Sequence, residues 1–284
     1  MKIIECPRDA MQGMKEFVPT AKKLEYISAL LRVGFDTIDV GSFVSPKLIP
    51  QMQDTAGVLL QLDMSLTKSK LLAIVANVRG AQDAVVFDEI SYLGFPFSVS
   101  ETFQQRNTNS SIEESLKRVE EIQFLCLNSK KTLVVYLSMA FGNPYGDVWN
   151  PGIVHKWAAK LVGMGVKVIS LADTIGVSNP ASISELFSNI IPEFKNSEIG
   201  AHLHTRPDAW REKLQAAYDA GCRRFDGAIK GFGGCPMAED ELVGNMATEN
   251  LLSFFEEKKI EAGIDKAAFT EAMVLANKVF MEHI

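Results

Sequence analysis

Cysteine is scarce in this chain of 284 residues, which has four in total. They stand at positions 6, 126, 222 and 235, with no CxxC spacing between any two of them. Small secreted domains held by disulfides are much denser in cysteine, and structural zinc sites are usually closed by paired thiolates. We therefore expect reduced thiols and no structural zinc site of the paired-cysteine type.

The chain also lacks a positive charge excess and a long apolar run. It has 29 Lys and Arg against 35 Asp and Glu, a formal net charge of -6, and its cations are scattered. This balance argues against a nucleic-acid partner. No apolar run approaches the roughly 20 residues of a membrane span, and the opening MKIIECPRD is too short in apolar residues for a signal peptide. We expect no membrane partner and a cytoplasmic protein.

A linker or low-complexity tract is missing as well, so we expect one domain over residues 1–284, with 231–284 as a loop and a C-terminal helical extension. Short apolar, β-branched runs recur along the chain and predict strands at 3–6, 35–40, 71–76, 89–94, 133–139, 166–172, 199–204 and 225–229. Helical periodicity lies between most of them, at 20–33, 111–128, 151–164, 180–191 and 208–220.

Eight strands alternating with helices match the size of an α/β protein with a single (β/α)₈ TIM barrel, here with additional C-terminal helices. A doubly wound open sheet is the alternative. It is disfavoured because no GxGxxG follows the first strand, where CPRDAMQ stands instead.

Polar residues gather where the predicted strands end. Arg8 and Asp9 follow the first strand, Asp39 lies at the end of the second, and Asp173 follows the sixth. The C-terminal ends of the strands form the catalytic face of a TIM barrel, so these side chains are expected to meet there. Arg8 and Asp9 could also be a surface ion pair of little value, or the guanidinium could stabilise a developing oxyanion.

His202 and His204 are two of only four histidines in the chain, and they stand two positions apart on the seventh strand. Residues i and i+2 of a strand face the same side, so both rings should project into the barrel mouth. They are either a hydrogen-bonded core pair or two ligands for one divalent cation, with Asp9 completing the shell. A mixed nitrogen and oxygen shell favours Mg²⁺ or Mn²⁺.

Two further segments have two interpretations each. The stretch GFGGCP at 231–236 is either a plain turn with an inert thiol or a mobile flap that brings Cys235 to the barrel mouth as a proton donor. Asn245 is either a helix cap or a metal ligand through its amide oxygen.

Together these motifs resemble the 3-hydroxy-3-methylglutaryl-CoA lyase family. The resemblance rests on CPRDAMQ, SFVSPKLIPQMQD at 42–54, SIEES at 111–115, LADTIGV at 171–177, HLH, GFGGCP and GNMATENL at 244–251, in this order along nearly the whole chain. The RD and HxH elements are shared with a wider superfamily of metal-dependent barrels, whereas the SFVSPK and GGCP elements are specific to the lyase branch.

The resemblance implies a metal held by Asp9, His202, His204 and Asn245, and a homodimer. It also implies catalytic roles for Arg8, Asp39, Asp173, His202 and Cys235, and substrate binding by Arg8, Gln12, Ser42 and Lys47. The implied reaction is a retro-Claisen cleavage of an acyl-CoA to acetyl-CoA and a 3-oxo acid, in which Arg8 stabilises the enolate and Cys235 delivers a proton.

Three places depart from the family pattern, the first being Ala10-Met11-Gln12-Gly13, where the family has Gly-Leu-Gln-Asn. Asp39 stands where the family has Glu, and Thr205-Arg206-Pro207 replaces an aspartate after the second histidine. Arg206 could pair with a substrate anion or face solvent at a helix start. The departures leave two alternatives to the acyl-CoA lyase: an aldolase acting on a free oxo-acid, and an acyl-CoA-binding protein without turnover.

Overall fold

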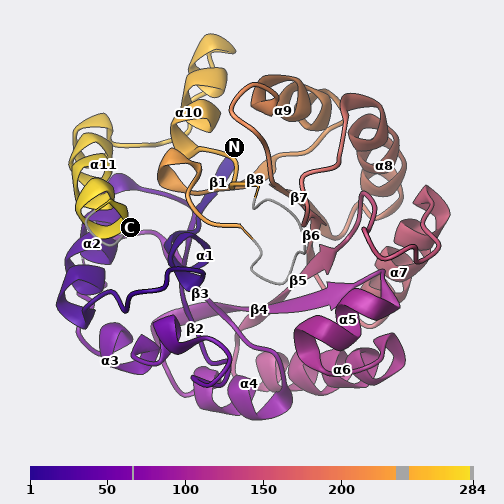
Figure 1. The fold of residues 1–284 in the computed structure, drawn as a ribbon, viewed down its shortest axis with the longest axis horizontal. Helices are drawn as coiled ribbons and strands as arrows, with labels where there is room; N and C mark the ends of the chain where they lie inside the picture. Colours follow the sequence, from indigo (N-terminus) through magenta and orange to yellow (C-terminus); the bar gives the residue numbers. More distant parts are fainter. Residues whose placement is uncertain (66, 235–242, 282–284) are drawn as a thin grey trace.

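Eight parallel strands close into a barrel in the order of the sequence, from β1 to β8 (Figure 1). The computed structural model describes residues 1–65, 67–234 and 243–281. The barrel closes because β8 pairs with β1 along four residues, from Lys2 opposite Arg224 to Glu5 opposite Gly227. This confirms the predicted TIM barrel and excludes the open sheet. The strands are β1 (Lys2–Glu5), β2 (Thr37–Ser42), β3 (Lys70–Ile74), β4 (Ile90–Ser98), β5 (Thr132–Ser138), β6 (Val168–Asp173), β7 (Glu198–Leu203) and β8 (Arg224–Gly227).

The helices lie mainly on the outer side of the barrel, except for the short α1, which lies inside their ring (Figure 1). They are α1 (Pro7–Gln12), α2 (Thr20–Val33), α3 (Thr55–Leu59), α4 (Val78–Val85), α5 (Glu101–Thr108), α6 (Ile112–Asn128), α7 (Pro151–Gly163), α8 (Pro180–Glu193), α9 (Trp210–Asp219), α10 (Thr248–Glu257) and α11 (Lys266–Phe280), with short 3₁₀ turns at Pro50–Met52 and Ile229–Gly231. Side-chain caps begin helices such as α6 and α7: Ser111 and Glu114 form a capping box on α6, and Asn150 caps α7 ahead of Pro151.

The residues that follow the first strand form a helix. We expected Arg8 and Asp9 at the end of a strand, but β1 stops at Glu5 and both residues lie on α1. Pro7 occupies the first helical turn, where a residue with a fixed φ and no N–H is favoured, and it ends the strand pairing. The six-residue helix thus carries both side chains across the barrel mouth.

The C-terminal helices complete the ring around the barrel. Figure 1 shows α11 beside α2 and α10 close to α9. The Phe280 ring meets Tyr26 of α2 edge-on, with centroids 5.9 Å apart, and the Phe269 ring lies 6.4 Å from that of Phe35. The backbone N–H of Asp265 donates to the Val33 carbonyl at 2.9 Å. Residues 248–280 are therefore part of the barrel's helical layer.

The helices of the described part of the chain include none with both the length and the hydropathy to cross a bilayer.

Glu5 is a fully buried carboxyl group that ties β1 to the C-terminal part of the barrel. Its Oε1 accepts the Ile229 N–H at 2.9 Å, and its Oε2 accepts the Thr248 hydroxyl at 2.6 Å. Burial raises the pKa of Glu5 to about 8, and the two hydrogen bonds only partly offset this. Glu5 therefore holds the chain on both sides of the 231–247 segment and is protonated at neutral pH.

Glu5→Gln should remove a pH-dependent loss of stability. Because the unfolded carboxyl group ionises near its ordinary pKa of 4.5 and the folded one near 8, the wild-type free energy of unfolding should fall as the pH rises from about 4.5 to 8. Glutamine accepts from Ile229 and donates to Thr248 without titrating, so the variant should be more stable than the wild type at pH 8, by roughly 1–2 kcal/mol. Urea unfolding at pH 5.5 and 8 measures this; equal pH slopes in the two proteins would contradict the assignment.

Candidate metal and active site

The C-terminal ends of the strands surround a cavity of about 140 Å³. One part of its lining is polar and comes from α1, β5, β7 and the ends of the strands: Arg8, Asp9, Gln12, Ser138, Thr174, His202 and His204. The other part is largely apolar: Val44, Ile49, Ile74, Ala76, Pro96, Phe103, Tyr136 and Ala172, with Asn107 and Thr108. This cavity suits a ligand that has both a charged or polar end and an apolar arm.

Arg8 is held by three side chains at the polar end of the cavity. Its Nε and Nη2 both donate to Asp39 Oδ2, at 2.9 and 2.6 Å. Its Nη1 donates to Asp9 Oδ1 at 2.9 Å and to Gln12 Oε1 at 2.8 Å. A guanidinium has five N–H groups, and these contacts use four of them. The buried ion pair excludes the surface interpretation of Arg8 and Asp9, and the shorter acid at position 39 still reaches the arginine.

The charges of this group set the protonation of its acids. Burial alone raises the pKa of Asp9, but Arg8, the two histidines and a hydrogen bond from Asn245 outweigh it and lower that pKa below the ordinary value. Asp39 differs because burial raises its pKa to about 6, which Arg8 only partly offsets. Asp9 is therefore an ionised carboxylate, the form that binds cations.

His202 and His204 face each other through their Nε2 atoms, which lie 3.2 Å apart. The Nδ1 of His204 is 3.0 Å from the Val243 carbonyl oxygen, an atom that can only accept, so this Nδ1 carries the hydrogen. The Nδ1 of His202 lies 3.1 Å from Asp226 Oδ2 and donates to it in the same way. Both Nε2 lone pairs are thereby directed at one point.

Two facing lone pairs repel each other unless a cation lies between them. Burial and the neighbouring His202 lower the pKa of His204 to about 4, so this ring stays neutral. Burial opposes a charge on His202 too, but Asp226 overrides it and raises that pKa. A proton or a metal ion on this pair relieves the repulsion, and neutral imidazole nitrogens are metal ligands.

Asp9 completes a set of ligand atoms that fits one metal ion. The ligand atoms of Asp9, His202 and His204 all lie within 4.8 Å of one another, and all three residues are buried. Nitrogens that bind one ion at about 2.1 Å and at right angles lie about 3 Å apart, which agrees with the observed separation of the two Nε2 atoms. These three residues can hold a divalent cation.

Asn245 reaches this group along the end of β7. Residues 244–246 run antiparallel to the end of that strand: the Thr205 N–H donates to Gly244 O at 2.9 Å and the Met246 N–H to Leu203 O at 3.1 Å. The Asn245 Nδ2 donates to Asp9 Oδ2 at 2.8 Å and to Phe232 O at 2.9 Å. Asn245 thus lies beside Asp9, with its amide nitrogen turned to that carboxylate, and ligation through its amide oxygen stays a prediction. It is a part of the site and caps no helix.

Gly233 shows why the loop after β8 is rich in glycine. Its φ is +99°, and a Cβ there would lie 2.8 Å from the Asp9 carbonyl oxygen and 2.7 Å from Asn245 Nδ2. Gly233 therefore lets the backbone of the GFGGCP loop pass close to Asp9 and Asn245. Cys235, the predicted proton donor, lies outside the described residues.

Asp173 does not line the cavity, although Ala172 and Thr174 on either side of it do. Its Oδ2 accepts the Lys213 Nζ at 2.9 Å and the Ser178 hydroxyl at 2.5 Å. Lys213, from α9, also donates to the carbonyl oxygens of Gly176 and His204, at 2.9 and 3.0 Å. The structure therefore links Asp173 to the backbone of a histidine rather than to the cavity.

The predicted substrate-binding residues occupy different places. Gln12 lines the cavity beside Arg8 and donates to Asp9 Oδ1 at 2.9 Å. Ser42 is buried at the end of β2, where its hydroxyl accepts the Val44 N–H. Lys47 is exposed in the 43–50 segment, which contributes Val44 and Ile49 to the cavity. Arg206 faces solvent, with a side chain 74% exposed, and pairs with Asp208 at 3.4 Å.

Three contributors to the site escaped prediction from the sequence. Lys213 lies within an amphipathic helix, Asp226 in the middle of a short strand, and Val243 acts through its backbone carbonyl. The only local signal was Asp226, a charged residue inside the otherwise apolar run FDGAI at 225–229.

Comparisons with known proteins identify the family of this chain. The sequence model of the HMGL-like family matches residues 2–275. A cytoplasmic 3-hydroxy-3-methylglutaryl-CoA lyase of Danio rerio is 35% identical over 275 residues, which cover 96% of this chain and 81% of the relative. The chain belongs to the 3-hydroxy-3-methylglutaryl-CoA lyase family.

Solved structures of this lyase family superpose on the barrel. The HMG-CoA lyase of Bacillus subtilis aligns with a TM-score of 0.92 at 30% identity, over 99% of this chain and 93% of that one. An HMG-CoA lyase of Acinetobacter baumannii, solved with coenzyme A and 3-methylmalate, aligns with a TM-score of 0.90 at 29% identity, over 99% and 91% of the two chains. The lyase family thus shares the whole barrel and its C-terminal helices.

Lys213→Met should be strongly destabilising. It removes the buried cation that serves Asp173, Gly176 and His204 and leaves the Asp173 carboxylate without its ion pair. Breaking a buried pair by removing one partner costs about 3–5 kcal/mol. Lys2→Met is the matched control, because its pair with Glu198 is partly exposed and should be worth less than about 1 kcal/mol. Urea unfolding of both variants makes the comparison, and a similar loss in the two would show that the Lys213 contacts add little.

Proposed function

We propose that this protein is a divalent-metal-dependent carbon–carbon lyase that cleaves 3-hydroxy-3-methylglutaryl-CoA, or a related 3-hydroxyacyl-CoA, to acetyl-CoA and a 3-oxo acid. The observation that carries the proposal is the pair of imidazole Nε2 atoms, 3.2 Å apart beside the ionised Asp9, with both Nδ1 atoms engaged elsewhere. Family membership supports the reaction class, and the geometry of the two imidazoles supports a metal centre for that reaction.

The metal is Mg²⁺ or Mn²⁺, held by Asp9, His202 and His204, with the Asn245 amide oxygen as a fourth ligand. The mixed nitrogen and oxygen donors and the absence of thiolates from this ligand set favour these ions. When bound, such an ion would hold the substrate's tertiary hydroxyl and carboxylate and would lower the pKa of that hydroxyl.

Arg8 provides the second charge that the reaction needs. After a base removes the hydroxyl proton, the carbon–carbon bond breaks, the 3-oxo acid forms, and the bonding electrons go to the acetyl-CoA enolate. Asp39, Asp9 and Gln12 use four of the five Arg8 N–H groups, and the fifth can donate to that enolate oxygen. Asp39 holds the guanidinium for this task, Asp173 positions His204 through Lys213, and Cys235 supplies the proton that converts the enolate to acetyl-CoA.

The lining of the cavity supports an acyl-CoA substrate. Val44, Ile49 and Phe103 offer an apolar wall for the branched acyl chain, opposite Arg8 and the metal ligands. Ser42 supports the 43–50 segment, and Lys47, exposed on that segment, is placed to meet phosphates of coenzyme A, the molecule found in the Acinetobacter baumannii lyase. A homodimer stays a prediction, as does a cytoplasmic location, since the relatives include lyases named as cytoplasmic and as mitochondrial.

His202→Ala should abolish turnover. With Mg²⁺ or Mn²⁺ the wild-type protein should release acetyl-CoA from 3-hydroxy-3-methylglutaryl-CoA, and EDTA should stop the release. Loss of one of the two imidazole ligands should lower kcat/KM about 10³-fold or more. His155→Ala is the matched control, because His155 lies on the exposed surface of α7, paired with Glu193, and should leave the rate unchanged.

The same assay separates the competing functions. Cleavage of a free hydroxy-oxo-acid with no activity on acyl-CoA substrates would favour the aldolase. Binding of acyl-CoA and metal without cleavage of any 3-hydroxyacyl-CoA tested would favour a binding protein. Either result would overturn the proposal.

Cys235→Ala should slow turnover and leave metal affinity within about twofold, because a proton donor acts after the carbon–carbon bond breaks. Titration calorimetry with Mn²⁺ and a steady-state assay measure the two quantities. An unchanged kcat would remove the thiol from the mechanism.

A further inference from the structure

We propose that Asp226 is a positioning residue that fixes the tautomer of His202 and thereby makes its Nε2 a metal ligand. The inference rests on the proposed metal-dependent function and goes beyond it by naming a residue outside the cavity lining that sets metal affinity.

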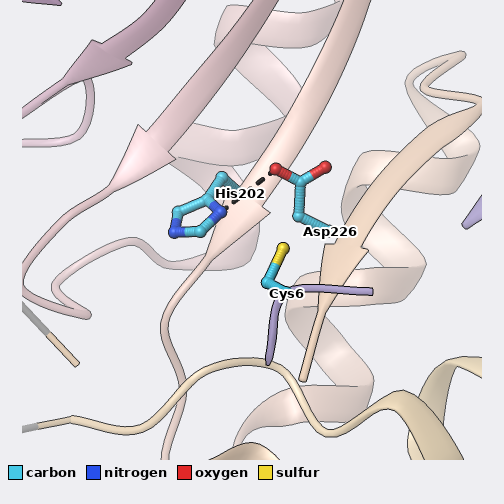
Figure 2. Close-up of side chains that lie close together, drawn as sticks. All are labelled: Cys6, His202 and Asp226. Atoms are coloured by element: carbon cyan, nitrogen blue, oxygen red, sulfur yellow. Dashed lines mark hydrogen bonds and ion pairs between the residues drawn. The ribbon is translucent and has the colours of Figure 1, made fainter. Parts of the chain in front are cut away.

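Asp226 lies on β8 within hydrogen-bonding distance of His202. Figure 2 shows its carboxylate pointing at the His202 ring on the neighbouring strand β7, with the hydrogen bond between Oδ2 and Nδ1 drawn as a dashed line. The side chain of Asp226 is 1% exposed. Its other oxygen, Oδ1, has no hydrogen-bond partner within the described ranges. His202 is therefore the donor that the described residues offer this buried carboxylate.

Arg224 is a buried cation on the same strand as Asp226. The two residues are i and i+2 on β8, so their side chains lie on the same face of the strand, inside the barrel. The Arg224 side chain is 1% exposed, and its closest acidic partner in an ion pair is Asp36, at 3.9 Å. Burial disfavours the charge on Arg224, but Asp226, the strongest of the opposing groups, raises its pKa. A guanidinium keeps its charge in proteins, so Arg224 places a permanent positive charge near the Asp226 carboxyl group.

The hydrogen bond with Asp226 decides where the His202 hydrogen sits. A carboxylate only accepts, so Nδ1 must carry the hydrogen and Nε2 keeps its lone pair toward Asp9 and His204. Carboxylates that hold metal-ligating histidines in this way also raise the basicity of the ligand nitrogen.

An alternative is a second metal site formed by Cys6, His202 and Asp226. Their candidate ligand atoms lie within 4.8 Å of one another, and Figure 2 shows the thiol near Asp226. Burial and the surrounding carboxylates raise the pKa of the Cys6 thiol well above its ordinary value, so it is a neutral thiol and a poor ligand. A metal on Asp226 would also require His202 to give up its Nδ1 hydrogen. The geometry therefore favours a hydrogen-bonded pair over a second metal site.

Asp226→Asn is the sharpest test because it keeps the shape and removes the charge. Its amide nitrogen can donate to Nδ1, which places the hydrogen on Nε2 and blocks the metal. Loss of such an outer hydrogen bond weakens metal binding about 10–100-fold. Glu198→Gln is the matched control. It neutralises a carboxylate on the neighbouring strand β7, at the end of that strand opposite to His202, where its partner is Lys2. The Mn²⁺ dissociation constant, measured by calorimetry on both variants and the wild type, should change only for Asp226→Asn.

A spectroscopic measurement on the wild type keeps the proposal testable even if Asp226→Asn fails to fold. The chain has four histidines, so ¹⁵N-labelled rings give few signals. With Mg²⁺ bound, the His202 ring should show a protonated Nδ1 and a hydrogen-free Nε2. A hydrogen on Nε2 of His202, or a Mn²⁺ dissociation constant for Asp226→Asn within twofold of the wild type, would overturn the proposal.

The two levels of the account fail in different ways. If the wild-type protein binds no metal and cleaves no acyl-CoA, the proposed function is wrong. If it binds metal and cleaves 3-hydroxy-3-methylglutaryl-CoA while Asp226→Asn does both equally well, the function stands and the positioning role of Asp226 is wrong.

Discussion

The site depends on two hydrogen bonds that hold the histidine rings by their Nδ1 atoms. Strand geometry alone puts His202 and His204 on one face of β7, but it leaves each ring free to rotate and to place its hydrogen on either nitrogen. Asp226 Oδ2 and Val243 O, which both accept, remove that freedom and turn the two Nε2 atoms toward one point. The two histidines of the HLH motif thereby present their Nε2 atoms to each other, 3.2 Å apart.

The rest of the barrel serves to keep these partners in place. Glu5 fastens Ile229 and Thr248 to β1, so the segment between them returns to the end of β7 and delivers both the Val243 carbonyl and Asn245. Lys213 fixes the backbone at His204 from the other side. Pro7 ends β1 early, and the short helix that follows carries Arg8 and Asp9 over the barrel mouth. Distant parts of the chain thus meet beside the two histidines.

Much of this architecture could be predicted from the sequence because its signals are local. Apolar runs predict the eight strands. Helical periodicity predicts α2 with the bounds that the structure has, Thr20–Val33. The residues of the site that carry motifs, Arg8, Asp9, His202, His204 and Asn245, were also predicted. Asp226, Lys213 and Glu5 were not, because each is a single charged residue whose role comes from contacts with residues far away in the chain. The helix at Arg8 was missed since its six residues are too few to show a helical period.

The most direct test of the account is to count the histidine nitrogens on bound Mn²⁺. Pulsed electron paramagnetic resonance on protein with ¹⁵N-labelled histidine detects each directly coordinated imidazole nitrogen. The account predicts two such nitrogens in the wild-type protein and one in His204→Ala, because His202 and His204 bind the same ion through Nε2. A wild-type spectrum with one coupled nitrogen or none would contradict it, whatever the activity of the protein.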